Sequence, residues 1–147
     1  MNQEAFDSKK SEMNLFNNGQ SLDQYDYPSE KTSGILWAYL LKRSLERIFQ
    51  HQSFKGVSCL DIGSGNGWTA EALVMKGAVA YAMDISLGAC KFVRERSRVR
   101  VFDLPVVCCD GENLPFRNHV FEVAIINSAL HHFPPFQDKL VYGEILS

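Results

Sequence analysis

Apolar residues recur at helical spacing over residues 31–52. Ile35 and Tyr39 are four positions apart, and Leu45 and Ile48 are three apart, which aligns such side chains along one face of an amphipathic helix. Beyond Gly56 the pattern changes, because residues 57–62 form a short and almost continuous apolar run that is typical of a buried strand. The sequence thus predicts a helix followed by a first strand.

Short apolar runs then alternate with longer amphipathic segments as far as the C-terminus. The pattern predicts helices and strands in the order helix 67–76, strand 79–84, helix 87–98, strand 105–109, strand 121–127 and helix 136–147. This alternation is typical of an α/β sheet with mostly parallel strands, and the apolar strands indicate cover on both faces. We predict a Rossmann-like, doubly wound α/β domain, a class that binds its ligands at the carboxyl ends of the strands.

Residues 1–30 differ from the rest of the chain, because they are rich in Asn, Gln, Ser and Asp. We predict a flexible N-terminal arm over residues 1–30 and one domain over residues 31–147. Tyr25 and Tyr27 stand out in the arm. Two interpretations remain open for them: docking of the arm on the domain, or closure of a lid over a ligand pocket.

The overall composition fits one globular domain of 147 residues, with 46% hydrophobic and 22% charged residues, and excludes a disordered chain. A net charge of −2 provides no field that would draw the protein to nucleic acid or to an anionic membrane. No apolar run approaches the roughly 18 residues of a membrane helix, and the N-terminus lacks the apolar segment of a signal peptide. We expect no nucleic-acid partner, no membrane insertion and a cytoplasmic location.

Four cysteines, Cys59, Cys90, Cys108 and Cys109, lie in apolar surroundings without a C-x-x-C pair. We interpret them as buried, reduced thiols and expect no metal site. A basic run follows in the second half of the chain, at Lys91, Arg94, Arg96, Arg98 and Arg100. A solvated helix face explains this run more simply than an anionic partner does.

A glycine-rich turn follows the first predicted strand, in the segment D-I-G-S-G-N-G of residues 61–67. Glycines permit tight turns and close approach to a ligand. The dinucleotide fingerprint G-x-G-x-x-G would require a glycine where Trp68 stands, and no Gly-Lys-Ser/Thr triplet of a phosphate loop is present. The loop therefore suits a nucleoside-like ligand better than a pyrophosphate, with a purely structural turn as the alternative.

Three further strand ends carry polar residues. Asp84 lies twenty-one residues after Gly63 (84 − 63 = 21), where a carboxylate of such a sheet accepts the two hydroxyls of a ribose; the alternative is a helix cap. Asp110 follows the third strand, either as an acceptor for an exocyclic amine or as a simple Asp-Gly turn. The fourth strand is followed by Asn127 and by adjacent histidines, His131 and His132, which suit loop positions or, for one of them, a general base.

Together these segments resemble the class I S-adenosylmethionine-dependent methyltransferases, over about residues 25–146 and most closely the group that acts on small molecules. The family's motif, acidic-x-Gly-x-Gly-x-Gly, matches residues 61–67 without a gap, and L-H-H-F at residues 130–133 resembles a segment of this group. The resemblance implies S-adenosyl-L-methionine as cofactor. It implies cofactor contacts at Asp61, Gly63, Ser64, Gly65, Asp84, Ile85, Asp110, Gly111 and Asn127. Asp84 would bind the ribose, Ile85 would pack on the adenine, and Asp110 would accept from its N6.

The chain departs from the family in two respects. Asn127 is followed by Ser-Ala-Leu rather than by the Pro-Pro-Tyr of members that methylate nucleobases and glutamine amides, which disfavours those substrates. Family members normally have seven strands, whereas this pattern ends after the fourth. We therefore expect the N-terminal half of a seven-stranded methyltransferase fold, a chain truncated after the fourth strand, and self-association through the exposed edge of that strand.

Three functions compete at this point. The first is S-adenosylmethionine-dependent methyl transfer to a small-molecule acceptor, a reaction that requires alignment of the acceptor and exclusion of water. The second is a non-catalytic S-adenosylmethionine-binding or interaction module, which lacks the half of the fold that shapes the substrate site. The third, a nucleotide-dependent oxidoreductase, is disfavoured by Trp68.

Overall fold

The structure is a computed structural model that describes residues 10, 14, 43–127 and 129. Lys10 and Asn14, within the predicted arm, are exposed and helical. The rest of the arm, the first part of the predicted helix 31–52, the histidines His131 and His132, and the predicted helix 136–147 lie outside the described residues.

The described elements follow the predicted order. Residues 43–51 are helical, and the elements after them are β1 (Ser58–Ile62), α3 (Trp68–Met75), β2 (Val79–Asp84), α4 (Leu87–Val99), β3 (Val106–Cys108) and β4 (Val123–Ile126). The predicted boundaries differ from these mainly at strand ends. Pro105 lies just before β3 rather than inside it, which fits a residue without an N–H donor, and its carbonyl accepts from Ala82 N–H at 3.0 Å.

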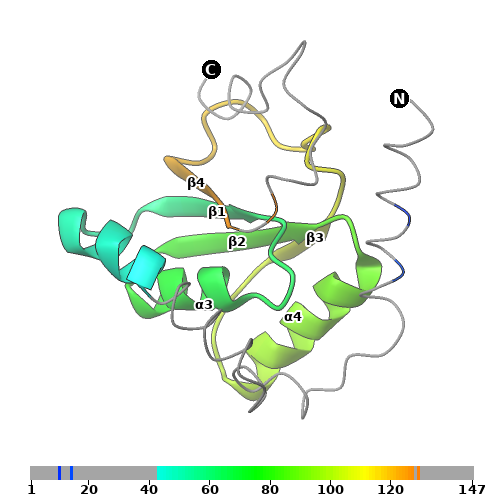
Figure 1. The fold of residues 1–147 in the computed structure, drawn as a ribbon, viewed down its shortest axis with the longest axis horizontal. Helices are drawn as coiled ribbons and strands as arrows, with labels where there is room; N and C mark the ends of the chain where they lie inside the picture. The colour runs from blue at the N-terminus through cyan, green and yellow to red at the C-terminus, as the bar shows by residue number, and fades with distance from the viewer. Residues whose placement is uncertain (1–9, 11–13, 15–42, 128, 130–147) are drawn as a thin grey trace.

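The four described strands form one parallel sheet, as predicted, and their order in it is β3-β2-β1-β4 (Figure 1). In the register, Asp61 of β1 lies opposite Ala82 of β2 on one side and opposite Ile125 of β4 on the other. All carboxyl ends of the strands therefore meet at one edge of the sheet, where the glycine-rich loop begins.

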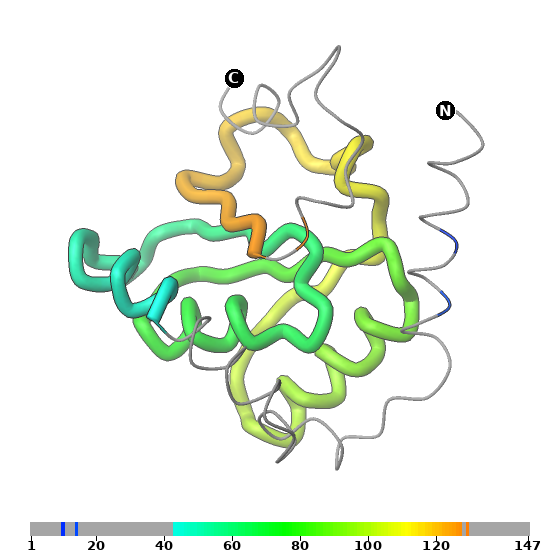
Figure 2. The backbone as a smooth tube through the Cα atoms, in the orientation of Figure 1, coloured from blue at the N-terminus to red at the C-terminus, as the bar shows by residue number. Residues whose placement is uncertain are grey.

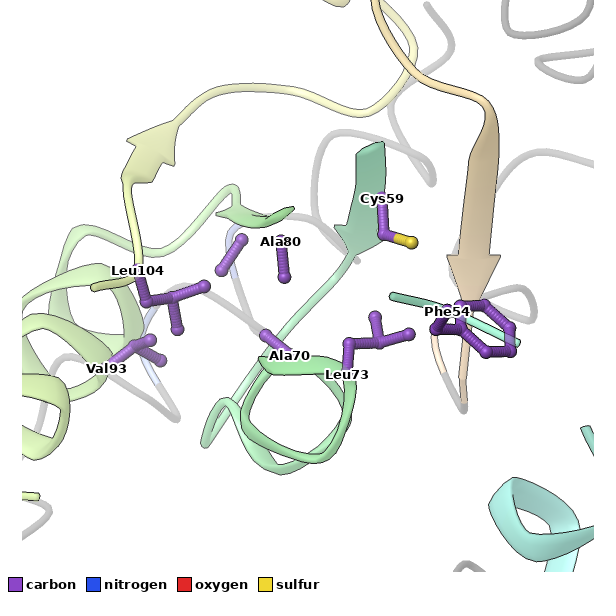
Figure 3. Packing of buried hydrophobic residues seen from close by; sticks show 8 residues of the cluster. Phe54, Cys59, Ala70, Leu73, Ala80, Val93 and Leu104 are labelled. Atoms are coloured by element: carbon purple, nitrogen blue, oxygen red, sulfur yellow. The ribbon is translucent and has the colours of Figure 1, made fainter. Parts of the chain in front are cut away.

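Helices α3 and α4 cover the same face of the sheet (Figures 1 and 2). Side chains pack between the helices and the sheet in one cluster of buried residues, shown in Figure 3. Its members are Phe54, Cys59, Ala70, Leu73, Ala80, Ala82, Val93 and Leu104. The alternate residues of the strands point to the opposite face, because successive strand residues face opposite ways. These are Leu60, Ile62 and Met83, against which Phe116 and Phe121 pack.

Three of the features predicted from the pattern need correction. Cys108 is exposed, whereas Cys59 and Cys90 are buried, because Cys108 ends β3, the outermost strand on that side of the described sheet. Strand β4 was predicted to be buried on both faces, yet its residues are only half-buried. Among the described strands it pairs with β1 alone, so neighbours cover it less.

The third correction concerns the basic run on α4, which we interpreted as a solvated face. Arg96 is only 5% exposed, because its guanidinium donates to the Glu71 carboxylate of α3 from Nε at 2.8 Å and from Nη2 at 2.6 Å. Lys91, Arg94 and Arg98 are exposed as predicted. Arg100, whose side chain is partly exposed, also donates to Glu71, so two arginines of the run contact the neighbouring helix.

We predict that Leu73→Ala lowers the free energy of unfolding by about 2–5 kcal/mol, because it empties a fully buried site between α3 and the sheet. The matched control is Met75→Ala on the same helix, where the side chain is 80% exposed and the change should stay within about 0.5 kcal/mol. Urea unfolding followed by circular dichroism measures both. Equal effects of the two substitutions would contradict the packing described above.

Candidate functional site

The glycine-rich loop joins the carboxyl end of β1 to the start of α3. Gly63, Gly65 and Gly67 have φ values of 69°, 49° and 76°, a region that L side chains rarely adopt. Ser64 N–H donates to the Met83 carbonyl at 2.9 Å, and Gly67 N–H donates to the Ser64 carbonyl at 2.7 Å. The loop is therefore a fixed turn held against the end of β2.

Two of the glycines also allow other parts of the protein to approach closely. A Cβ atom on Gly63 would collide with the Ala129 side chain after β4, and one on Gly67 would lie 2.9 Å from Val93 Cγ1 of α4. From the sequence, these glycines are expected to make room for a ligand. At positions 63 and 67, the structure shows close contacts with the protein itself.

Asp84, at the end of β2, holds the loop through its carboxylate. Its Oδ2 accepts from Gly65 N–H and its Oδ1 from Ser86 N–H, both at 2.8 Å, and the residue is only 7% exposed. A carboxylate presents two oxygen atoms that accept several hydrogen bonds at once, and here each of them accepts from a backbone N–H. The predicted ribose-binding residue is thus also a structural link between β2 and the loop.

Asp61 points from β1 toward α3. Its Oδ2 accepts from Ala70 N–H at 3.1 Å, in the first turn of the helix. Burial raises the pKa of Asp61 from 3.8 to about 7, the Ala70 N–H opposes this shift, and the nearby charge of Asp84 adds to it. The described contact of this side chain is therefore with the protein, at the base of the loop.

Two polar atoms of the loop, Ser64 Oγ and Asn66 Oδ1, are buried and have no hydrogen-bond partner among the described residues. Burying a polar atom without a hydrogen bond lowers the stability of a protein, so such atoms usually have a protein, water or ligand partner. Ser64 is among the predicted contact residues. Asn66 is not, because nothing in its type or position marked it beyond its place between two glycines.

The end of β3 lies beside the end of β2, because Cys109 N–H donates to the Asp84 carbonyl at 3.0 Å. Asp110 follows, and its Oδ1 accepts from Glu112 N–H at 3.0 Å. This bond belongs to the Asp-Gly turn that is the alternative interpretation of the sequence at this position. Gly111 is buried, and Ile85 is half-buried. Ile85 thus directly follows the end of β2, and Asp110 lies two residues after the end of the neighbouring strand β3.

The end of β4 approaches the start of α3. Asn127 Nδ2 donates to Thr69 Oγ1 at 3.1 Å. Asn127 directly follows β4, and Thr69 lies in the first turn of α3, just after the glycine-rich loop. Sequence reasoning did not single out Thr69, since a threonine in a first helical turn is common. The structure thus brings the ends of β1, β2, β3 and β4 together around one loop.

Three of the four cysteine thiols are poor nucleophiles because of their surroundings. Burial raises the pKa of the Cys59 and Cys109 thiols to about 11 and that of Cys90 to about 12, which keeps these thiols protonated at neutral pH. No group of three or more possible metal ligands occurs among the described residues. In the same part of the chain, no helix has the length and apolarity to cross a membrane.

Comparison with known proteins finds similarity to methyltransferases. Residues 60–142, more than half of the chain, match the model of a family described as a methyltransferase domain. The chain is 34% identical over 85 residues to a demethylmenaquinone methyltransferase of Corynebacterium urealyticum, covering 58% of this chain and 34% of the relative. It is 35% identical over 78 residues to that of Corynebacterium kroppenstedtii, covering 53% and 31%. The match therefore spans about a third of each relative.

Solved structures share the fold. Magnesium protoporphyrin IX methyltransferase from Synechocystis PCC 6803 with bound SAM has a TM-score of 0.69 at 17% identity, over 86% of this chain and 64% of that one. A putative S-adenosyl-L-methionine-dependent methyltransferase from Methanococcus maripaludis has a TM-score of 0.63 at 18% identity, over 87% and 63%. These likenesses establish the Rossmann-like architecture.

The raised pKa of Asp61 predicts a pH-dependent stability. Between about pH 4 and pH 7 the folded protein retains a proton on Asp61 that the unfolded chain has lost, so this group's stabilising contribution falls as the pH rises. The stability of the unaltered protein relative to Asp61→Asn should decline across that range and level off above it. Urea unfolding of both proteins from pH 4 to pH 8 measures the difference.

The control for this experiment is Asp103→Asn, at an exposed carboxylate outside the site. It removes a carboxyl group from an exposed side chain, and the two pH profiles are compared. A profile for Asp61→Asn that does not differ from that of Asp103→Asn would mean that the Asp61 carboxyl is not desolvated in solution.

Proposed function

The chain belongs to the methyltransferase domain family, and on that premise we propose that it binds S-adenosyl-L-methionine at the carboxyl ends of its strands. The proposal rests above all on Asp84, a buried carboxylate that ends β2 and accepts from the glycine-rich loop at Gly65. The two buried oxygen atoms without partners, Ser64 Oγ and Asn66 Oδ1, lie in the same loop. These groups fit a ligand that carries hydroxyl and ammonium donors.

In this proposal each strand end holds one part of the cofactor. Asp84 binds the ribose hydroxyls, the half-buried side chain of Ile85 packs on the adenine, and Asp110 with Gly111 lies at the adenine edge. The loop residues Asp61, Gly63, Ser64 and Gly65, together with Asn127 after β4, form the methionine end. Each assignment follows the matched position in the family motif and the place of that residue at the strand ends.

We propose further that the protein transfers a methyl group to a small-molecule acceptor. When bound, the cofactor supplies an electrophilic methyl group, so the protein's task is to orient the acceptor and exclude water. One of His131 and His132 as a general base remains a prediction. The names of the Corynebacterium relatives make demethylmenaquinone the first acceptor to assay, and binding without turnover would favour the non-catalytic module instead.

The organisation of the chain is part of the same proposal. Residues 31–147 form the cofactor-binding domain, and residues 1–30 form an arm. The four cysteines are free thiols, as is usual for cysteines of proteins in a reducing compartment. We infer a cytoplasmic location on that basis, and the net charge of −2 favours a small-molecule partner over nucleic acid.

Titration with S-adenosylhomocysteine tests the cofactor proposal. The unaltered protein should bind it and should not bind NAD. Asp84→Ala should weaken binding by at least about tenfold, because losing a charge-assisted hydrogen bond costs roughly 1.5–3 kcal/mol. Isothermal titration calorimetry measures the affinities, and the far-UV circular dichroism spectrum verifies that the variant is folded.

The matched control is Asp103→Ala, which removes an exposed carboxylate of the loop before β3. Its affinity for S-adenosylhomocysteine should equal that of the unaltered protein. An unchanged affinity of Asp84→Ala would remove Asp84 from the site, and tight binding of NAD would favour the oxidoreductase.

Strand β4 generates a separate prediction. It forms one edge of the described sheet, and its apolar residues Val123–Ile126 are half-buried, so its outer edge suits pairing with another strand. We predict that this chain, produced by itself, self-associates in a concentration-dependent way that Ile125→Lys reduces. Light scattering measures this, and a monodisperse monomer at all concentrations would contradict it.

A further inference from the structure

An ionic cluster, buried at Glu71 and Arg96, joins α3 to α4 near the glycine-rich loop. Glu71 lies in the first turn of α3, and Arg96 and Arg100 lie at the end of α4. Glu71 Oε2 accepts from Arg96 Nε at 2.8 Å and from Nη2 at 2.6 Å, while Oε1 accepts from Arg100 Nη1 at 2.7 Å. The side chains of Glu71 and Arg96 are 11% and 6% exposed, so solvent screens this pair little.

Such a cluster is a costly way to stabilise a helix contact. Charges lose their hydration on burial, and apolar side chains of similar volume often serve stability equally well. What the ionic contact adds is geometry, because a guanidinium that donates two hydrogen bonds to a carboxylate fixes distance and orientation together. The position of α3 relative to α4 is therefore held more tightly than apolar packing alone would hold it.

A backbone hydrogen bond connects Glu71 to the glycine-rich loop. Glu71 N–H donates to the Gly67 carbonyl at 2.9 Å, so the residue clamped to α4 also closes the helical turn that begins at Gly67. On the other side, the Asp61 carboxyl accepts from Ala70 N–H. The downstream end of the loop is thus held between β1 and the arginines of α4.

Residue Gly67 has little room to adjust if α4 moves. A Cβ atom there would lie 2.9 Å from Val93 Cγ1, and Val93 belongs to the same helix as Arg96. A displacement of α4 relative to α3 would therefore change both the ionic contact and the packing against Gly67. The upstream part of the loop would follow, because Gly67 N–H donates to the Ser64 carbonyl at 2.7 Å.

We propose that Glu71 and Arg96 are positioning residues for the cofactor site, acting through the glycine-rich loop without contacting the cofactor. This rests on the proposed function, in which the loop holds the methionine end of S-adenosylmethionine. Loss of the clamp loosens the loop, and the ligand must then order it on binding, which lowers affinity. The effect is on binding, in addition to any effect on stability.

The test measures two properties of the folded protein for Glu71→Gln and Arg96→Met. The first is the affinity for S-adenosylhomocysteine by calorimetry, expected to weaken roughly 2- to 30-fold. The second is amide hydrogen exchange at Gly65 and Gly67 by NMR without ligand, expected to be faster than in the unaltered protein. Both are measured at a temperature where circular dichroism shows each variant folded.

The same helix offers a matched control pair. Arg98 and Glu95 form an ion pair of 3.8 Å whose side chains are 72% and 52% exposed, so Glu95→Gln and Arg98→Gln remove equal charges without touching the clamp. Both variants should keep the affinity and the loop exchange of the unaltered protein. Arg96→Lys retains the charge without the planar fork, so its affinity should lie between those of Arg96→Met and the unaltered protein.

A substitution with a smaller expected effect on stability keeps the proposal testable if Glu71→Gln does not fold. Arg100→Gln removes the donor to Oε1 from a side chain that is 40% exposed, and it should shift affinity and exchange in the same direction by a smaller amount. Variants that lose thermal stability but retain normal affinity and normal loop exchange would overturn the proposal. If the unaltered protein does not bind S-adenosylhomocysteine, the proposed function fails, and loop exchange alone then decides the positioning role.

Discussion

The arrangement at the carboxyl edge of the sheet depends on the Asp84 carboxylate. It accepts backbone N–H groups from Gly65 and Ser86, so one side chain links the end of β2 to both the glycine-rich loop and the start of α4. Charge-assisted bonds of this kind, partly buried, are stronger than neutral ones. The loop therefore has a defined conformation before any ligand arrives.

A second carboxyl group supports the loop from below. Asp61 accepts from Ala70 N–H and is buried close enough to Asp84 for that charge to contribute to its raised pKa. Burial favours the neutral form of the Asp61 carboxyl group, and the charge of Asp84 acts in the same direction. The two carboxyl groups that hold the loop are therefore coupled electrostatically as well as through the loop backbone.

The two faces of the sheet serve different purposes. On the helix face, small residues such as Ala80 and Ala82 let α3 and α4 approach closely, which brings α4 beneath the loop. On the other face, Phe121 packs edge-on against Tyr81 and Phe116 at ring distances of 5.3 and 5.0 Å. That aromatic group anchors the segment between β3 and β4, and hence the turn at Asp110. Packing on both faces thus sets where the strand-end residues lie.

The sequence by itself determined the order of elements, the parallel α/β class and the residues at the strand ends. These follow from local patterns: apolar runs, helical spacing, and Asp61, Asp84 and Asp110 at the ends of strands. Family membership was also readable, because the motif of residues 61–67 is contiguous. Each of these properties depends on neighbours in the chain.

Only the tertiary structure decided which partners those residues have. That Arg96 meets Glu71, that Gly63 lies against Ala129, and that Asn127 bonds to Thr69 are contacts between segments far apart in sequence. The exposure of Cys108 and the half-burial of β4 likewise depend on which strands are neighbours in the sheet. Periodicity shows that a side chain faces inward or outward, but the three-dimensional packing of the elements fixes what it meets there.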